Sequence, residues 1–238
     1  MRIKLTILLY AILLYCTPAL NAQEGKPYSI IDSVRYKLDL IHDYQADIEI
    51  EVDVEFINMP VKHARIFYKK PDKVKFESDE FLMLPRRGFD KQVTDILDEP
   101  FSAIYLGIET LNGKPHHVVR IVPLGKKPEV ILATWWIDTA SFQIARNESN
   151  LRKDGSFTVD FMYEDPGIIL PTKMTFSIEI EKFSIPLKFI GKSQGMEIDK
   201  SRMKEDSQGK VYIRFSNYRI NNNIPDDLFD EESSSKEE

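Results

Sequence analysis

The residues of this chain that could do chemistry are few, and a row of carboxylates is the largest group of them. Asp47, Glu49, Glu51, Asp53 and Glu55 alternate with apolar residues, and carboxylate oxygens are the ligands that Ca²⁺ and Mg²⁺ prefer. Residues two apart on a β-strand point to the same side of a sheet, where solvent screens neighbouring charges. We therefore interpret the row as the solvated face of a strand and predict no metal site.

The histidines form no catalytic or metal-binding pattern. His116 and His117 are adjacent, and adjacent strand residues face opposite sides, so the pair cannot readily bind one metal ion. The sequence also contains no Gly-x-Ser-x-Gly, no His-Glu-x-x-His and no Gly-rich phosphate-binding motif, which are patterns of hydrolases, zinc proteases and nucleotide-binding proteins. We therefore predict that the protein is not an enzyme and uses no cofactor.

The first 22 residues have the features of a secretory signal peptide. Arg2 and Lys4 supply positive charge, an apolar run follows from Leu5 to Leu14, and a stretch with small residues ends at Ala22. The run is about half of the ~20 apolar residues that a membrane-spanning helix needs. We predict cleavage after Ala22, export to the periplasm and a mature chain that begins at Gln23.

The only cysteine, Cys16, lies inside this predicted signal. Cys16 could instead be a lipid-attachment site that anchors the mature protein, but the residue before it is Tyr15, where the peptidase that processes lipoproteins needs a small side chain. We therefore favour loss of Cys16 with the signal. The mature chain would then contain no disulfide and no thiolate metal site.

Composition favours one folded domain and argues against a nucleic-acid partner. The chain has 238 residues, of which 42% are hydrophobic and 29% are charged, enough for one domain with a sizeable core. The formal net charge is −6 and the Lys and Arg residues are scattered, so no basic surface is expected for a phosphate backbone. We predict a domain over residues 23–225 and a disordered acidic tail over residues 226–238, which are poor in apolar side chains.

The spacing of the apolar residues changes near the start of the mature chain. Ile31, Val34, Leu38 and Ile41 recur at helical spacing, which predicts an amphipathic helix over residues 28–43. From residue 47 the period becomes two, which predicts a long strand with one face buried along its whole length. That face contains Ile48, Ile50, Val52, Val54 and Phe56.

Nine further strands are expected, with turns such as Asn112-Gly113-Lys114 between them. They cover residues 62–70, 73–78, 104–111, 116–124, 130–138, 142–149, 156–163, 173–181 and 210–220. Tight turns without intervening helices predict antiparallel pairing, so the fold class is mainly β with some α. In strand 130–138 both faces are apolar, and whether Trp135 or Trp136 points inward stays open.

One internal segment departs from the strand pattern. Residues 85–100 begin and end with proline, and Val93, Ile96 and Leu97 within them could form a short helix that ends before Pro100. We interpret this segment as a candidate lid.

Three short motifs follow one another along the chain. The first is Ile66-Phe67-Tyr68-Lys69-Lys70-Pro71 ahead of an alternating strand, the second is Trp136-Ile137-Asp138, and the third is Asn217-Tyr218-Arg219-Ile220-Asn221 ahead of Ile224-Pro225-Asp226 and Phe229. In this order they resemble the LolA and LolB family of outer-membrane lipoprotein-sorting proteins, and the chain looks like a branch from Bacteroidetes-type bacteria. The resemblance spans nearly the whole mature chain.

The resemblance implies a fold and a function. The fold would be an incomplete antiparallel β-barrel, covered by the N-terminal helix and a short lid, around a cavity for the acyl chains of lipoproteins or other lipids. We expect a monomeric periplasmic carrier with transient inner- and outer-membrane sorting proteins as partners. The residues that we expect to bind lipid face inward on the predicted strands: Ile50, Val52, Val54, Phe56, Ile66, Tyr68, Phe76, Phe161, Met174, Phe176 and Ile178.

The chain departs from the family at one position. Family members have an arginine before the turn proline that holds the lid over the empty cavity, whereas this chain has Lys70. A lysine is a single-point donor and cannot form the several simultaneous bonds of a planar guanidinium. We therefore expect Lys70 to be an exposed turn residue rather than a lid latch.

Two other functions remain open, because a fold does not fix a function. The protein could be a lipid-sensing or protein-interaction module of the cell envelope that transfers nothing. It could also be a LolB-like receptor, if Cys16 is lipidated and anchors the chain.

Overall fold

A computed structural model describes residues 19–78, 96–152, 155–164, 167–179, 197–198 and 208–230. The nine strands predicted after residue 60 are confirmed, with ends within three residues of the expected ones. The elements in chain order are α2 (Ala19–Asp39), β1 (Asp43–Val54), β2 (Ile57–Asn58), β3 (Lys62–Lys69), β4 (Lys73–Glu77), β5 (Phe101–Leu111), β6 (Lys114–Pro123), β7 (Val130–Asp138), β8 (Ile144–Leu151), β9 (Ser156–Met162), β10 (Lys173–Glu179), β11 (Glu197–Ile198), β12 (Gln208–Ile220) and the 3₁₀ helix η2 (Asp226–Phe229).

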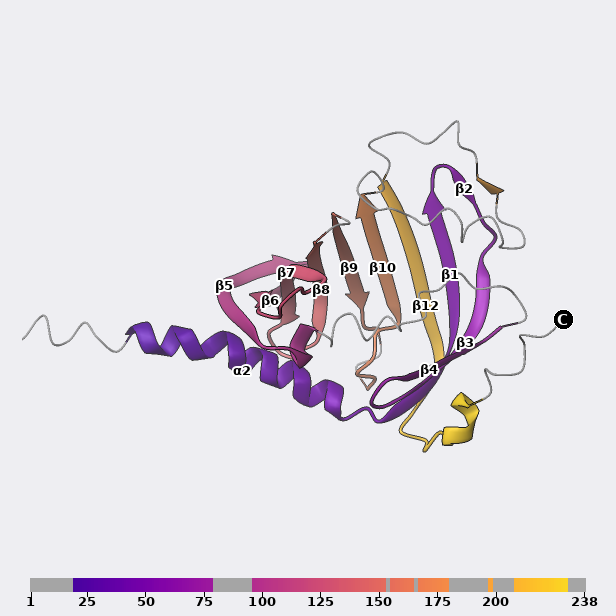
Figure 1. Cartoon of the computed structure of the whole chain (residues 1–238), viewed down its shortest axis with the longest axis horizontal. Helices are drawn as coiled ribbons and strands as arrows, with labels where there is room; N and C mark the ends of the chain where they lie inside the picture. Colours follow the sequence, from indigo (N-terminus) through magenta and orange to yellow (C-terminus); the bar gives the residue numbers. More distant parts are fainter. Residues whose placement is uncertain are drawn as a thin grey trace, which may run out of the picture.

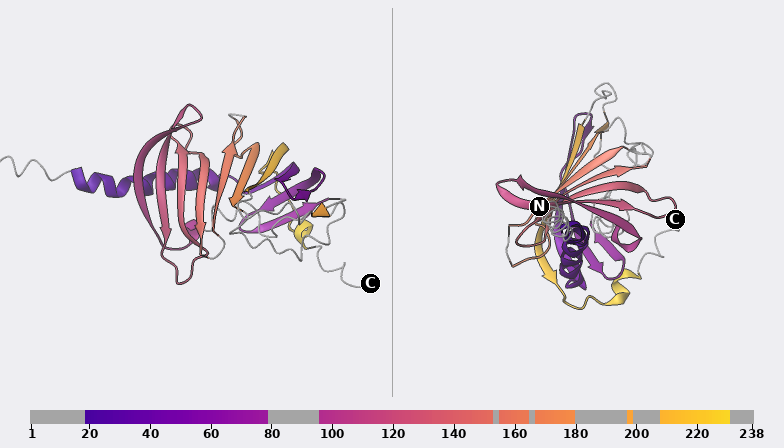
Figure 2. Two further views of the ribbon diagram at one scale, coloured as in Figure 1. Left: turned by 90° about the horizontal axis from the view of Figure 1, so that it is seen from above. Right: turned by 90° about the vertical axis from the view of Figure 1, so that its left-hand side faces the viewer.

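The described strands form one antiparallel sheet that does not close. Its order is β11-β2-β1-β12-β10-β9-β8-β7-β6-β5, and β3 pairs with β1 and with β4. Helix α2 runs along the inner side of the β5–β8 half, and β1, β3 and β4 lie beyond the end of the helix (Figure 1). Seen along the helix axis, the strands fan around α2 (Figure 2). The predicted mainly β fold, an incomplete antiparallel barrel with an N-terminal helix, is confirmed.

The predicted alternation of β1 is confirmed, and it sets the inner face of the sheet. Ile48, Ile50 and Val54 are buried while Asp53 is exposed, and Val52 is only half-buried. On the outer face Arg214 of the neighbouring strand donates to Glu49 at 2.5 Å and to Glu51 at 3.1 Å. The acidic row is therefore a solvated face with cross-strand ion pairs.

The end of the predicted helix is wrong by four residues. Helix α2 ends at Asp39, and the chain enters β1 at Asp43 instead of remaining helical. The carboxylate of Asp43 is buried and accepts hydrogen bonds from the backbone N–H of Asn222 at 2.8 Å and of Ile224 at 3.3 Å. These long-range bonds fix an extended backbone where the spacing of Ile41 indicated another helical turn.

Two large cores lie on the inner side of the sheet, one beyond the other along the molecule. The first core packs α2 against β5–β8; its buried residues are Ile30, Ile31, Val34, Ile96, Leu97, Val119, Ile121, Ala133, Trp135, Ile137 and Ile144. The second core lies among β1, β3, β9, β10 and β12; its buried residues are Ile41, Tyr44, Ala46, Ile48, Ile50, Ile66, Phe157, Val159, Leu170, Met174 and Ile213. Phe161 packs against both cores.

The two tryptophans of β7 have opposite environments. Trp135 is fully buried in the first core, beside Ala133 and Ile137. Trp136 is on the outer face, where its indole N–H donates to Glu109 at 2.8 Å. The structure thereby assigns Trp135 to the inner face, which the sequence left open.

The predicted lid lies partly outside the described residues, and the start of the predicted tail is folded. Of the predicted lid, residues 85–95, with Val93, lie outside the described residues; Ile96 and Leu97 are buried in the first core. Asp226–Phe229, predicted to belong to a disordered tail, form a 3₁₀ helix instead. The ammonium groups of Lys69 and Lys73 contact Asp226 at 3.1 and 2.7 Å, so lysines of β3 and β4 hold this short helix. Among the described helices, none is long and apolar enough to cross a membrane.

Candidate functional site

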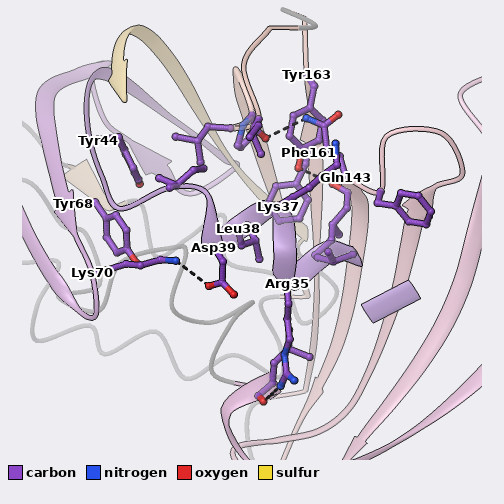
Figure 3. A pocket seen from close by; sticks show the side chains of 18 of the residues that line it. Arg35, Lys37, Leu38, Asp39, Tyr44, Tyr68, Lys70, Gln143, Phe161 and Tyr163 are labelled. Carbon is purple, nitrogen blue, oxygen red and sulfur yellow. Dashed lines mark hydrogen bonds and ion pairs between the residues drawn. The ribbon is translucent and has the colours of Figure 1, made fainter. Parts of the chain in front are cut away.

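A cavity of about 450 Å³ lies where the two cores meet, at the C-terminal end of α2. The last turns of the helix form one wall, and the start of β1, the β3–β4 turn, the β7–β8 turn, the end of β9 and the loop before β10 form the others (Figure 3). The lining residues are Val34, Arg35, Lys37, Leu38, Asp39, Ile41, Tyr44, Tyr68, Lys70, Pro71, Leu97, Asp98, Phe142, Gln143, Ile144, Phe161, Tyr163, Ile169, Leu170 and Pro171.

The β7–β8 turn brings Phe142 and Gln143 to the cavity. Asp138 ends β7, and its carboxylate accepts the backbone N–H groups of Ala140 at 2.9 Å and of Ser141 at 2.7 Å. Burial alone would raise the pKa of Asp138, but the hydrogen bonds from Ser141 and Ala140 outweigh burial and lower the pKa below its usual value. The charged carboxylate therefore shapes the turn that forms this wall.

The loop before β10 is fixed by hydrogen bonds from three neighbouring elements. The Gln143 amide donates to the Ile169 carbonyl at 3.1 Å, and the Tyr218 hydroxyl donates to the Pro171 carbonyl at 2.7 Å. The Tyr163 hydroxyl also donates to the Ile144 carbonyl at 3.0 Å. These bonds fix the loop before β10 relative to the β7–β8 turn, β8 and β12. The polar groups of the wall thereby position its apolar side chains.

The β3–β4 turn brings Tyr68, Lys70 and Pro71 to the opposite wall. The peptide bond between Lys70 and Pro71 is cis, and the Lys70 backbone N–H donates to the His42 carbonyl at 2.8 Å. The Lys70 ammonium lies 2.9 Å from an Asp39 carboxylate oxygen. Lys70 therefore connects the turn to the last residue of α2, beside the cavity (Figure 3).

Aromatic rings cover the wall next to this turn. The rings of Tyr44 and Tyr68 have centroids 5.2 Å apart, and those of Tyr44 and Tyr218 are 5.9 Å apart. Such pairs stabilise a packed surface beyond the area that they bury. Together with Phe161 on the other side, they give the cavity an aromatic lining on β1, β3 and β9.

Arg35 joins α2 to the segment that precedes β5. Its guanidinium donates to the Leu97 carbonyl and lies 5.6 Å from the centre of the Phe101 ring. Leu97 is one of the cavity residues. Arg35 thus fixes the position of Leu97, which lines the cavity next to the segment before β5.

The structure distributes the predicted lipid-binding residues over several places. Tyr68 and Phe161 line the cavity, as does Lys70. Five others, namely Ile50, Ile66, Phe76, Met174 and Phe176, belong to the second core or pack against it. Val54 and Phe56 form a small separate cluster with Val52 and Ile57. Ile178 is placed by its backbone, which pairs with Phe157 and Gly209.

Sequence reasoning missed most of the cavity wall. The end of α2, the β7–β8 turn and the loop before β10 supply most of the lining residues, whereas the prediction took them only from strands. A lining made of turns leaves no hydrophobic period to detect. The Lys70-Pro71 turn and the apolar spacing of Val34 and Leu38 were the available signals.

The wall suits binding better than catalysis. Most of its side chains are aliphatic or aromatic, and the others are charged or polar; pockets for small apolar ligands have this composition. Within the described part of the chain, no group of three or more His, Cys, Asp or Glu residues is arranged to hold a metal ion.

Comparison with known proteins identifies the fold. No protein-family model and no curated protein sequence matches the chain. A domain described as an outer-membrane lipoprotein-sorting protein, from Vibrio parahaemolyticus, is 13% identical, with a TM-score of 0.54 and 87% of this chain and 97% of that chain covered. A DUF1329 family protein from Desulfovibrio piger is 15% identical, with a TM-score of 0.55 and the same coverage of 87% and 97%.

A LolA superfamily protein from Nitrosomonas europaea is 12% identical, with a TM-score of 0.52 and 83% of this chain and 96% of that chain covered. The protein therefore has a LolA-like fold, as the three sequence motifs implied. The narrower resemblance to a Bacteroidetes-type branch stays a prediction.

Proposed function

We propose that this LolA-like protein is a periplasmic carrier, which holds an acyl chain of a lipoprotein or another lipid in the cavity at the end of α2 and transfers it toward the outer membrane. The observation that supports this function is the cavity of about 450 Å³ between the two cores, with a mainly apolar wall. The protein catalyses no reaction in this proposal, because a binding cavity and a way to open it are sufficient.

A carrier of this kind removes a large energetic barrier. Exposure of acyl carbon to water costs ~0.8 kcal/mol per CH₂, so one long chain meets a barrier on the order of 10 kcal/mol. A cavity of about 450 Å³ falls within the range of roughly 300–1,000 Å³ that is typical of pockets for small molecules. An acyl chain inside it would be removed from water.

Loading and release require that the wall can open, and the contact between the β3–β4 turn and the helix end is weak enough for that. Lys70 and Asp39 have side-chain exposures of 32% and 76%. An ion pair this exposed contributes about 0–1 kcal/mol. Separation of the turn from α2 would therefore cost little compared with the burial of an acyl chain.

The test is transfer of a fluorescent acyl lipid between vesicles by the mature chain, residues 23–238. Leu38→Trp would place an indole in the cavity and should abolish accelerated transfer. Tyr36→Trp is the matched control, because Tyr36 is on the same helix but 68% exposed and outside the cavity wall; it should transfer as the wild type does.

A second cavity variant, together with melting curves, controls for misfolding of the first. Ile169→Trp fills the cavity from the loop before β10 rather than from the helix, and melting curves show whether either variant is unfolded. Wild-type protein that does not accelerate transfer would contradict the carrier function. Folded Leu38→Trp and Ile169→Trp proteins with unchanged transfer would show that the lipid is held elsewhere.

A further inference from the structure

The cavity wall contains more cationic than anionic side chains. The cationic ones are Arg35, Lys37 and Lys70, and the acidic ones are Asp39 and Asp98. Asp39 is paired with Lys70 at 2.9 Å. The Arg35 guanidinium donates to the carbonyl of Leu97, the residue before Asp98. These contacts give Lys70 an anionic partner and Arg35 a backbone acceptor, and they leave Lys37 and Asp98 among the charged residues of the wall.

Lys37 is half-buried in the last turn of α2, next to Leu38, which packs against the first core. No carboxylate of the described residues forms an ion pair with it, although the neighbouring Lys70 has such a partner. The C-terminal end of a helix favours a cation in its last turn, and Lys37 occupies that position in α2. Hydrogen bonds between an ammonium group and an anion are stronger than those between neutral groups, so an anionic partner would stabilise the Lys37 side chain.

The negative end of the helix does not outweigh this cation. A helix C-terminus is equivalent to about half of a negative charge, whereas Lys37 alone supplies a full positive charge. The wall as a whole also has one more formal positive charge than negative charges, from three cations and two carboxylates. The formal charges on the wall therefore favour an anionic group over a neutral one.

We propose that the ligand is an acyl chain with an anionic headgroup, a carboxylate or a phosphate monoester, whose charge pairs with Lys37. The tail then lies against the apolar wall formed by Leu38, Phe161 and Leu170. This inference rests on the proposed function, because it assigns the ligand class of the same cavity. A carboxylate would come from a free fatty acid and a phosphate from a phospholipid-derived lipid.

The test compares three ligands with the same tail: palmitate, hexadecyl phosphate and hexadecanol. Each competes with a neutral fluorescent acyl probe on the mature wild-type chain. At least one anionic ligand should bind about tenfold tighter than hexadecanol, and the better of the two identifies the source of the headgroup. Lys37→Gln should remove this preference and leave hexadecanol binding unchanged, whereas Lys37→Arg should keep it.

Lys126→Gln is the matched control, since Lys126 is an exposed lysine outside the cavity, and it should keep the preference. Equal binding of the two anions and hexadecanol to the wild type overturns the anionic headgroup while the carrier function stands. A preference that persists in Lys37→Gln overturns the role of Lys37. Failure of all three ligands to displace the probe contradicts the proposed function itself.

Discussion

Lys70 occupies the position at which the sequence departs from the LolA and LolB family that it resembles. Because a lysine cannot form the several bonds of an arginine, we expected an exposed turn residue. In the structure its ammonium pairs with Asp39 at the end of α2, and its side chain lines the cavity. The ammonium group of Lys70 therefore contacts the carboxylate at the end of the helix. Because both side chains are partly exposed to solvent, this ion pair is weak.

The first prediction at the residue scale concerns this pair. Lys70→Gln and Asp39→Asn should each change the free energy of unfolding by less than about 1 kcal/mol, and their coupling in a double-mutant cycle should be of the same size, since exposed ion pairs contribute little. Urea denaturation of the two single variants and the double variant measures the free energies of unfolding, from which the coupling between Lys70 and Asp39 is obtained. A coupling above about 2 kcal/mol would mean that the turn is fastened to the helix rather than separable from it.

Asp138 gives a second prediction, with a defined pH dependence. Loss of its hydrogen bonds to the β7–β8 turn in Asp138→Ala should lower the free energy of unfolding by about 1–2 kcal/mol at neutral pH. The pKa of Asp138 is lowered in the folded protein, so its contribution is present above the unfolded pKa of about 3.9 and is lost as the pH falls through the lower folded value.

The stability difference between wild type and Asp138→Ala should accordingly shrink below about pH 4. Chemical denaturation at a series of pH values measures this difference, in which the titration of the other carboxylates largely cancels. A difference that stays constant down to pH 2 would contradict the role of the charged carboxylate in shaping the turn.

Strands and their faces are the elements that the sequence predicts best. In β1 the acidic and apolar residues alternate so strictly that only one register buries the apolar face, and the structure has that register. The end of α2 was not predictable in this way. Ile41 has helical spacing, but Asp43 forms its hydrogen bonds with residues that lie about 180 positions away in the sequence.

Most of the cavity was unpredictable for a related physical reason. Its wall comes from the ends of elements and from turns, whose positions depend on hydrogen bonds such as those of Asp138 and Gln143. Of the inward strand residues that were predicted as a lining, Tyr68 and Phe161 line the cavity, whereas others such as Ile50 and Met174 are buried in the second core. Periodicity indicates on which face of the sheet a side chain lies. It does not indicate whether neighbouring side chains fill the space in front of that side chain.

A third prediction belongs to the closing segment that follows β12. Its residues are anchored to β1 by the buried Asp43 carboxylate, and Asn221 accepts the His42 N–H at 2.7 Å and donates to the Leu40 carbonyl at 2.7 Å. Asp43→Ala would leave two backbone N–H groups without their acceptor and should cost about 2–4 kcal/mol of stability. Lys73→Gln, which removes an exposed contact to Asp226, should have a much smaller effect.

Thermal or urea unfolding of the two variants tests this element. If Asp43→Ala and Lys73→Gln destabilise the protein equally, the segment is not held mainly by the buried carboxylate. Proteolysis after β12 gives an independent measure, because the segment should become cleavable in Asp43→Ala before it does in the wild type.

Across the described part of the chain, the open sheet and helix α2 explain where the cavity lies. Helix α2 covers the β5–β8 half of the inner face and ends at Asp39, before it reaches the second core. The described residues that line the cavity at this end belong mainly to turns and to the ends of strands. Among the described elements, the cavity therefore lies where α2 ends on the inner side of the open antiparallel sheet.

The predicted export and the alternatives for function can be separated on the same protein. A chain anchored through Cys16 would pellet with membranes and contain a diacylglyceryl group, whereas cleavage after Ala22 gives a released protein that begins at Gln23. A sensing module would hold lipid but would not accelerate its transfer between vesicles. Fractionation and the transfer assay together distinguish these outcomes from a released carrier.

Native mass spectrometry of the mature protein purified from the periplasm shows whether the cavity at the end of α2 holds an acyl chain. We predict a lipid adduct on the wild type and on Tyr36→Trp, and none on folded Leu38→Trp. If the wild-type protein has no bound lipid, or if the adduct persists equally in Leu38→Trp, the cavity at the end of α2 is not the site that holds an acyl chain.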